Sequence, residues 1–489
     1  MFLFSNFLTF FLTFFLTFFL TFFFIFLLNK KFIYNNLFFS FISLFLFLFL
    51  FLFLFLFLII IYFYFYFFFN FSNNYYLYNL INYDFSFNFL FNIQINFLSI
   101  YYFPFIYIFL LITILSLYFC LSYNKSEIFL FFFFTLIILI AGSVIFFTDS
   151  LIIFFFFYEL LLIPSFLILY KFAKTRKCIE AAYLMFFWTQ FGALFLIFSF
   201  IYLFFLTKSN SFFFISFFFF TKFEINFFFL CWIIGFGVKL PLWPFYGWLP
   251  KAHVEASTNF SIFLSGVLVK FAFFGLLKCL ITVQLEPTYI YIYPYLLIGL
   301  LDSIFKLFFQ IDLKKLVAFS TVVEMHWLTI CIISGQSPLI LANFCMLISH
   351  ALLSTNSFFL VDAINRRFKT RLITEINGIN FLCPKLFLIC LANLLIFLGF
   401  PGSIFFIAEI LFFSFTLDLF PTLAIILIIL LYFFNATFYF KNWFIVIFGM
   451  PNNLTKPLIV DLSSKEFILY SFILIILYWL GFTWQSFIF

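Results

Sequence analysis

The sequence predicts an all-α polytopic membrane protein, and the first observations behind this are compositional. Of the 489 residues, 67% are hydrophobic and only 8% are charged, whereas soluble domains carry about 25% charged residues. Apolar runs long enough for a membrane helix, about 20 residues, recur along the whole chain. This composition excludes soluble enzymes, nucleic-acid-binding domains and disulfide-rich scaffolds.

The apolar runs predict fourteen membrane-spanning helices. Two of them, 38–68 and 383–415, are long enough to be tilted, kinked or broken, and the polar stretch 70–96 is the longest loop. The helices are expected at about 7–28, 38–68, 97–119, 128–147, 150–170, 181–206, 226–248, 257–281, 290–308, 313–334, 338–363, 383–415, 420–440 and 466–486.

The N-terminal region, 1–120, is of low complexity. Residues 8–22 repeat Leu-Thr-Phe-Phe, which fits either a polar packing stripe on one helix face or compositional drift. Residues 44–58 alternate Leu and Phe, but both phases are apolar, so a membrane helix is expected rather than a strand. No removable signal peptide is expected. The 107 phenylalanines fit an AT-rich coding sequence, which suggests an organellar genome.

The basic residues test this helix count, because Lys and Arg collect on one side of a membrane. When each loop is numbered by the helix before it, eighteen of the 24 lie at odd loops and only Lys208, Lys222 and Lys278 lie on the even side. The bias supports fourteen spans, with both termini opposite the basic loops. The eighteen are Lys30, Lys31, Lys125, Lys171, Lys174, Arg176, Lys177, Lys251, Lys314, Lys315, Arg366, Arg367, Lys369, Arg371, Lys385, Lys441, Lys456 and Lys465.

Several charged or titratable residues lie inside the predicted spans. A charge at the centre of a membrane helix costs about 2.5–3.5 kcal/mol on insertion scales, so such residues are functional candidates. Buried ion pairs that only hold helices together are the alternative. Asp302 and Lys306 stand four residues apart near a span end and are expected to pair structurally. The candidates are Glu159, Lys239, Lys270, Glu324, His350 and Glu409.

Two predicted helices contain breaking residues beside these charges. Pro241 and Pro244 follow Lys239 in the seventh span, and Gly399-Phe400-Pro401-Gly402 precedes Glu409 in the twelfth. The offset of five helices predicts two inverted repeats, helices 4–8 and 9–13, with helices 7 and 12 broken. The expected domains are therefore 1–120, 121–285, 286–445 and 446–489.

A chain of titratable groups at mid-membrane depth suits protons or small cations, because burial and neighbouring charges shift pKa values. The eight cysteines form no metal-binding pattern, and no Walker, Rossmann or haem motif is present. The chain is therefore expected to supply no redox chemistry of its own.

The stretch Gly237-Val-Lys239-Leu-Pro241-Leu-Trp-Pro244-Phe-Tyr-Gly-Trp248-Leu-Pro250-Lys251-Ala-His253-Val-Glu255-Ala resembles the signature of the antiporter-like subunits of respiratory NADH:ubiquinone oxidoreductase, complex I. The resemblance covers about residues 140–415. Supporting matches are Tyr158-Glu159 through Pro164, Gly266 through Lys270, Asp312 through Ser320, Ser349-His350-Ala and Gly399 through Glu409.

The resemblance implies a proton-translocating membrane subunit. Glu159 and Lys239 would form the input pair, Lys270 and His350 would continue a central proton axis, and Glu409 would end it. The implied partners are other membrane-arm subunits, including neighbouring antiporter-like subunits, and lipids. NADH, FMN, iron–sulfur clusters and ubiquinone would lie in other subunits. The implied location is the mitochondrial inner membrane, with basic loops facing the matrix.

The chain departs from the family pattern at two places. Val323-Glu324-Met325-His326 stands where the family usually has Ser-His-Met-Gly, so either Glu324 or His326 would replace the usual histidine. Ser257 stands where a proline is usual. Two other functions stay open: a cation/proton antiporter that is not coupled to respiration, and a purely structural membrane subunit.

Overall fold

In the computed structural model, the described residues are 105–106, 108–116, 125–172, 175–283, 292–334, 337–419, 421–449 and 460–483. They belong to one compact unit, within 101–488. The first two predicted helices and the Leu-Thr-Phe-Phe repeat lie outside these residues. The division at 120, 285 and 445 stays a prediction.

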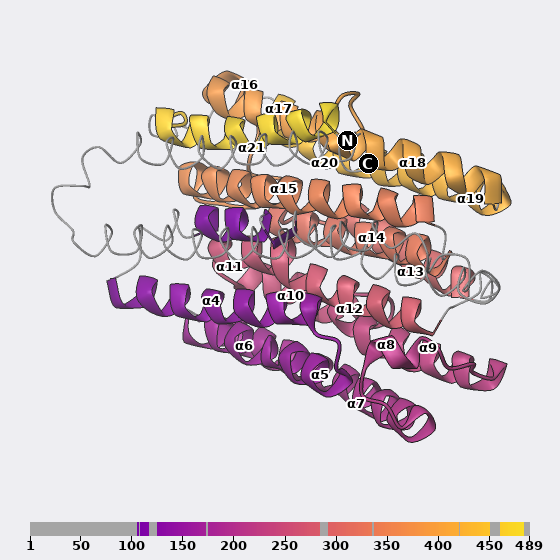
Figure 1. Cartoon of the computed structure of the whole chain (residues 1–489). Coiled ribbons are helices and arrows are strands. Elements are labelled where there is room, and N and C mark those ends of the chain that lie inside the picture. The colour runs from indigo at the N-terminus through magenta and orange to yellow at the C-terminus, as the bar shows by residue number, and fades with distance from the viewer. Residues whose placement is uncertain are drawn as a thin grey trace, which may run out of the picture. The chain divides into compact units, whose positions relative to one another are not determined.

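The part of the chain expected to form the first repeat is helical (Figure 1). Its helices are α4 (Lys125–Phe147), α5 (Leu151–Leu160), α6 (Leu162–Lys171), α7 (Arg176–Thr207), α8 (Phe212–Ile215), α9 (Lys222–Lys239), the 3-10 helix η2 (Phe245–Gly247), α10 (Trp248–Glu255), α11 (Thr258–Phe263), the π-helix η3 (Leu264–Leu268) and α12 (Val269–Thr282).

The second part is built in the same way. Its helices are α13 (Ile292–Phe308), α14 (Leu313–Ile333), α15 (Ser337–Phe368), α16 (Ile379–Leu382), α17 (Pro384–Phe397), α18 (Ile404–Leu419), α19 (Pro421–Ile428), the π-helix η4 (Ile429–Asn435), α20 (Ala436–Phe448) and α21 (Ser464–Phe482).

The predicted fold class is confirmed. Every predicted span from the fourth to the fourteenth corresponds to a helix, or to consecutive helices, of the described residues. Eight continuous helical segments of the described residues, some made of consecutive helices, are long and apolar enough to cross a membrane. The total of fourteen and the inverted orientation of the repeats stay predictions.

Both predicted helix breaks are present. The seventh span stops at Lys239 and resumes as η2 and α10, because Pro241 removes a backbone donor and cannot continue the helical turn. The twelfth span is interrupted between Phe397 and Ile404, where Gly399 and Gly402 have φ angles of 75° and 90°. Such angles favour glycine, because it lacks a Cβ atom.

Burial separates inner helices from outer ones. The apolar windows of α14 and α15 are entirely buried, while only about a third of that of α4 is. On α7, Phe187 and Phe205 expose 75% and 71% of their surface. An apolar surface of this kind suits contact with lipid chains. Glu324 and His350 therefore lie on the innermost helices.

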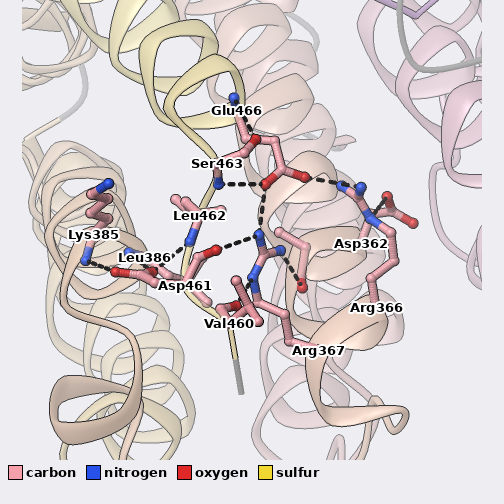
Figure 2. A network of polar contacts seen from close by, with 11 residues as sticks. Asp362, Arg366, Arg367, Lys385, Leu386, Val460, Asp461, Leu462, Ser463 and Glu466 are labelled. Atoms are coloured by element: carbon pink, nitrogen blue, oxygen red, sulfur yellow. Dashed lines mark hydrogen bonds and ion pairs between the residues drawn. The ribbon is translucent and has the colours of Figure 1, made fainter. Parts of the chain in front are cut away.

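A polar network joins the end of α15 to the start of α21 (Figure 2). Glu466 accepts from Arg366 Nη1 at 3.0 Å and from Arg367 Nη2 at 2.6 Å, and it also completes a capping box with Ser463. The Asp461 carboxylate accepts from the backbone N–H groups of the first turn of α17. This network fixes three helices at one end of the bundle.

Candidate functional site

The first cluster lies at the helix 7 break, where Lys239 is the last residue of α9. Its Nζ is 3.0 Å from Glu159 Oε1 and also donates to the Tyr158 carbonyl at 3.0 Å. The same Nζ lies 3.6 Å over the centre of the Tyr158 ring. A cation at a helix C-terminus is favoured by the helix dipole, and the ring face adds a cation–π attraction.

Glu159 has a second partner on the neighbouring helix. Gln190 on α7 donates from Nε2 to Glu159 Oε2 at 3.4 Å. The side chains of Lys239 and Glu159 are 13% and 18% exposed, so the pair is mostly buried but keeps some contact with its surroundings. The predicted input pair is therefore a direct ion pair with an accessible edge.

The second cluster is more deeply buried and contains Lys270, His350 and Glu324. Lys270 Nζ is 2.5 Å from His350 Nδ1, and His350 Nε2 is 3.5 Å from Glu324 Oε2. The His350–Glu324 contact is an ion-pair distance without hydrogen-bond geometry. A charged lysine requires Nδ1 to be an acceptor, which puts the ring proton on Nε2, facing the carboxylate.

A local helix distortion places Lys270. Just before it, η3 is a π-helix, and the Lys270 ammonium donates to the carbonyl of Ser265 within it. Single π-turns in α-helices frequently mark functional sites. Upstream, Ser257 caps α11 by accepting from the Phe260 N–H at 3.4 Å.

The third group is Glu409 on α18, which is only 6% exposed. Tyr432 donates to Glu409 Oε2 at 2.7 Å. A Cβ atom on Gly399 would lie 2.3 Å from the same oxygen, so the break in helix 12 supplies the space for this carboxylate. Trp327 of α14 packs on Phe412 and Phe413 of α18, which joins the helices carrying Glu324 and Glu409.

The predicted residues thus form three groups. Among the described residues, no hydrogen bond or ion pair joins the Glu159–Lys239 pair to the cluster of Lys270, His350 and Glu324. Of the two helix 10 candidates, Glu324 faces His350. His326 instead accepts from the backbone N–H of Trp243 at 2.9 Å. Asp302 and Lys306 pair as predicted, at 2.8 Å, and both also bond to Tyr246.

Two buried groups were not anticipated from the sequence. Lys314, which the sequence placed with the loop charges, is 2% exposed and donates to the Ala256 carbonyl at 2.5 Å. His253 is fully buried and stacks on Phe358 at 4.9 Å, and within the described structure neither of its ring nitrogens has a hydrogen-bond partner. His253 lies in the stretch 237–256, which carries the most specific part of the resemblance, and this position could have marked it as a candidate.

Two known proteins with related sequences carry the same name. The chain is 37% identical over 306 residues to "NADH-ubiquinone oxidoreductase chain 4" of Paramecium tetraurelia, covering 63% of this chain and 65% of the relative. The relative of the same name from Chondrus crispus is 30% identical over 338 residues, covering 67% of each chain. The chain therefore spans just under two thirds of the Paramecium relative.

Solved structures share the fold at low identity. A chain of respiratory complex I from Thermus thermophilus superposes with a TM-score of 0.68 at 18% identity, covering 80% of this chain and 83% of the other. A chain of the Mrp complex from Dietzia sp. DQ12-45-1b gives 0.66 at 15% identity, covering 78% and 81%.

A family model described as "NADH:quinone oxidoreductase/Mrp antiporter, TM" matches residues 148–437, which include the candidate residues Glu159, Lys239, Lys270, Glu324, His350 and Glu409. Since this match covers more than half of the chain, the protein belongs to the NADH:quinone oxidoreductase/Mrp antiporter membrane family.

Proposed function

We propose that this chain is a proton-translocating, antiporter-like membrane subunit of NADH:ubiquinone oxidoreductase, at the place that its relatives occupy as chain 4. The observation that carries the proposal is the buried row Lys270–His350–Glu324, where donor and acceptor groups alternate on inner helices. A merely structural subunit has no need for three titratable side chains placed in contact inside the bundle.

The location and the partners that we propose for this chain are those expected of a chain 4 subunit. The subunit works in the mitochondrial inner membrane beside other membrane-arm subunits, with its basic loops toward the matrix. NADH, FMN, iron–sulfur clusters and ubiquinone belong to other subunits, so this chain receives its energy through its neighbours. A proton moved against the membrane potential costs about 2.3 kcal/mol per 100 mV.

The residues divide the work as follows. Opening of the Glu159–Lys239 pair leaves the lysine without its carboxylate and changes the electrostatic field along the bundle. Lys270 then passes a proton to His350 Nδ1, and the Nε2 proton passes to Glu324. Glu324 then releases this proton, and the Glu409 carboxylate, to which the Tyr432 hydroxyl donates, takes it up beyond the end of the row.

Glu159→Gln and Lys239→Met in the assembled complex test this function. Both variants are expected to assemble normally and to lose most of the protons pumped per NADH oxidised, measured in proteoliposomes. Matched controls are Glu180→Gln and Lys177→Met, whose residues are exposed on α7. Normal pumping by the Glu159 or Lys239 variant would refute the proposed input pair.

The second candidate is a cation/proton antiporter that is not coupled to respiration. The chain superposes on the Mrp chain about as well as on the complex I chain, and this similarity of fold supports the second candidate. Sodium/proton exchange by the purified protein without quinone reduction, together with the absence of respiratory partners on native gels, would support this second function.

A further inference from the structure

The break in helix 7 leaves backbone groups without helical partners, and side chains from the second half of the chain bind them. The N–H of Trp243 donates to His326 Nε2 of α14 at 2.9 Å. The Trp243 carbonyl accepts from the hydroxyl of Tyr295 on α13. Both backbone groups of one residue in the break are thus bonded across the two halves.

The bonds of His326 define its chemical state. Its Nδ1 lies 2.8 Å from the carbonyl of Val322 and must donate, while Nε2 accepts from Trp243. A neutral imidazole with the proton on Nδ1 satisfies both bonds. The ring is fully buried, so neither nitrogen has a free site for a proton in transit.

A glycine makes room for this arrangement. A Cβ atom on Gly299 would lie 2.5 Å from His326 Nε2 and 2.6 Å from Trp243 Cβ. Three residues after Trp243, the hydroxyl of Tyr246 is bonded to Asp302 and Lys306, also on α13. Helix α13 therefore bonds the break at Trp243 and again at Tyr246, while α14 bonds it at Trp243.

The clamp bonds a residue close to Lys239 to a residue close to Glu324. Trp243 follows Lys239 by four residues, and His326 follows Glu324 by two. A shift of the break would therefore move the end of α9, which carries Lys239, relative to the helix that carries Glu324.

We propose that His326 is a positioning residue that holds the helix 7 break and thereby keeps Lys239 aligned with Glu159, without carrying protons itself. This inference rests on the proposed function and assigns the second helix 10 candidate a role of its own.

His326→Gln and His326→Phe in the assembled complex test the proposal. Gln can accept from the Trp243 N–H at the place of Nε2 but cannot relay a proton as imidazole does, whereas Phe can do neither. We expect Gln to retain most of the proton-to-electron ratio and Phe to lower it about fivefold or more, as expected when a buried N–H loses its acceptor. The Phe defect should be non-additive with Glu159→Gln, because both act on one pair.

Equal loss in the Gln and Phe variants would overturn the proposal, because it would make His326 a proton carrier. Full activity of the Phe variant would overturn it as well. If the Phe variant does not assemble, the Gln variant decides: retained pumping supports the clamp, and a pumping loss at normal assembly refutes it.

A parallel measurement of Glu159→Gln separates this inference from the function on which it rests. Normal pumping by Glu159→Gln would contradict the proposed input pair, whatever the His326 variants do. Loss in Glu159→Gln with normal pumping by both His326 variants would contradict the clamp alone.

Discussion

The Glu159–Lys239 pair and the Lys270–His350–Glu324 row both place a lysine inside the bundle, but they treat it differently. Lys239 meets a carboxylate directly at 3.0 Å, at a helix end, and its side chain stays 13% exposed. Lys270 is fully buried, and its nearest titratable partner is an imidazole nitrogen at 2.5 Å.

The difference in burial and in partners suits the two sites to different roles. Opening a direct ion pair requires separating two opposite charges, so the pair responds to the electrostatic field of a neighbouring subunit. In the row, a proton can pass between adjacent groups without separating a salt bridge. The accessible pair therefore suits a trigger, and the sealed row suits transfer.

Lys270→Met is expected to have the largest effect on this comparison. The change removes the amino group that lies 2.5 Å from His350 Nδ1 while filling a similar volume, so pumping should fall by about 100-fold or more, as when a positioned proton-transfer group is lost. Proton uptake by proteoliposomes during NADH oxidation measures it. Lys278→Met on the same helix is the control and should pump normally. Substantial pumping without Lys270 would mean that the row is not the route.

Gly399→Ala is expected to have an intermediate effect, and it sharpens the comparison at the far end of the row. The added Cβ atom would meet Glu409 Oε2. The alanine would also have to keep the φ angle of 75°, at a cost of about 1–2 kcal/mol. The amount of assembled complex on native gels should fall, and pumping per complex should fall with it. The control is Gly247→Ala, where φ is −58° and a Cβ meets nothing within 4 Å. If the two variants behave alike, Glu409 does not depend on the helix 12 break.

Arg367→Ala should have the smallest effect on pumping, because Arg367 contacts neither cluster in the described structure. Loss of its bonds to Glu466 and to the carbonyls of Val460 and Asp461 should cost about 1.5–3 kcal/mol of stability. Thermal inactivation of the assembled complex reports this cost. Arg366→Ala, with a side chain that is 45% exposed, should cost about 0–1 kcal/mol. A pumping defect in either variant at full assembly would extend the functional region to α21.

Some features were readable from the sequence because single residues enforce them. Pro241 ends α9 wherever the rest of the chain lies, and Gly399 with Pro401 interrupts the twelfth span for the same local reason. The buried charges were also identifiable, since insertion scales assign a cost from the residue type and its depth alone. The burial of Lys314 was not predicted, because a lysine in the first turn of a helix usually reaches water. Only the packing of the folded chain shows that this one does not.

The sequence by itself determined the helical membrane class, the two breaks and the residues that carry charge into the bundle, because hydropathy and backbone chemistry act locally. Only the tertiary structure decided which of these residues meet. Glu324 faces His350 while His326, two positions on, binds the Trp243 backbone, since successive positions of a helix point in different directions and each partner comes from a distant helix.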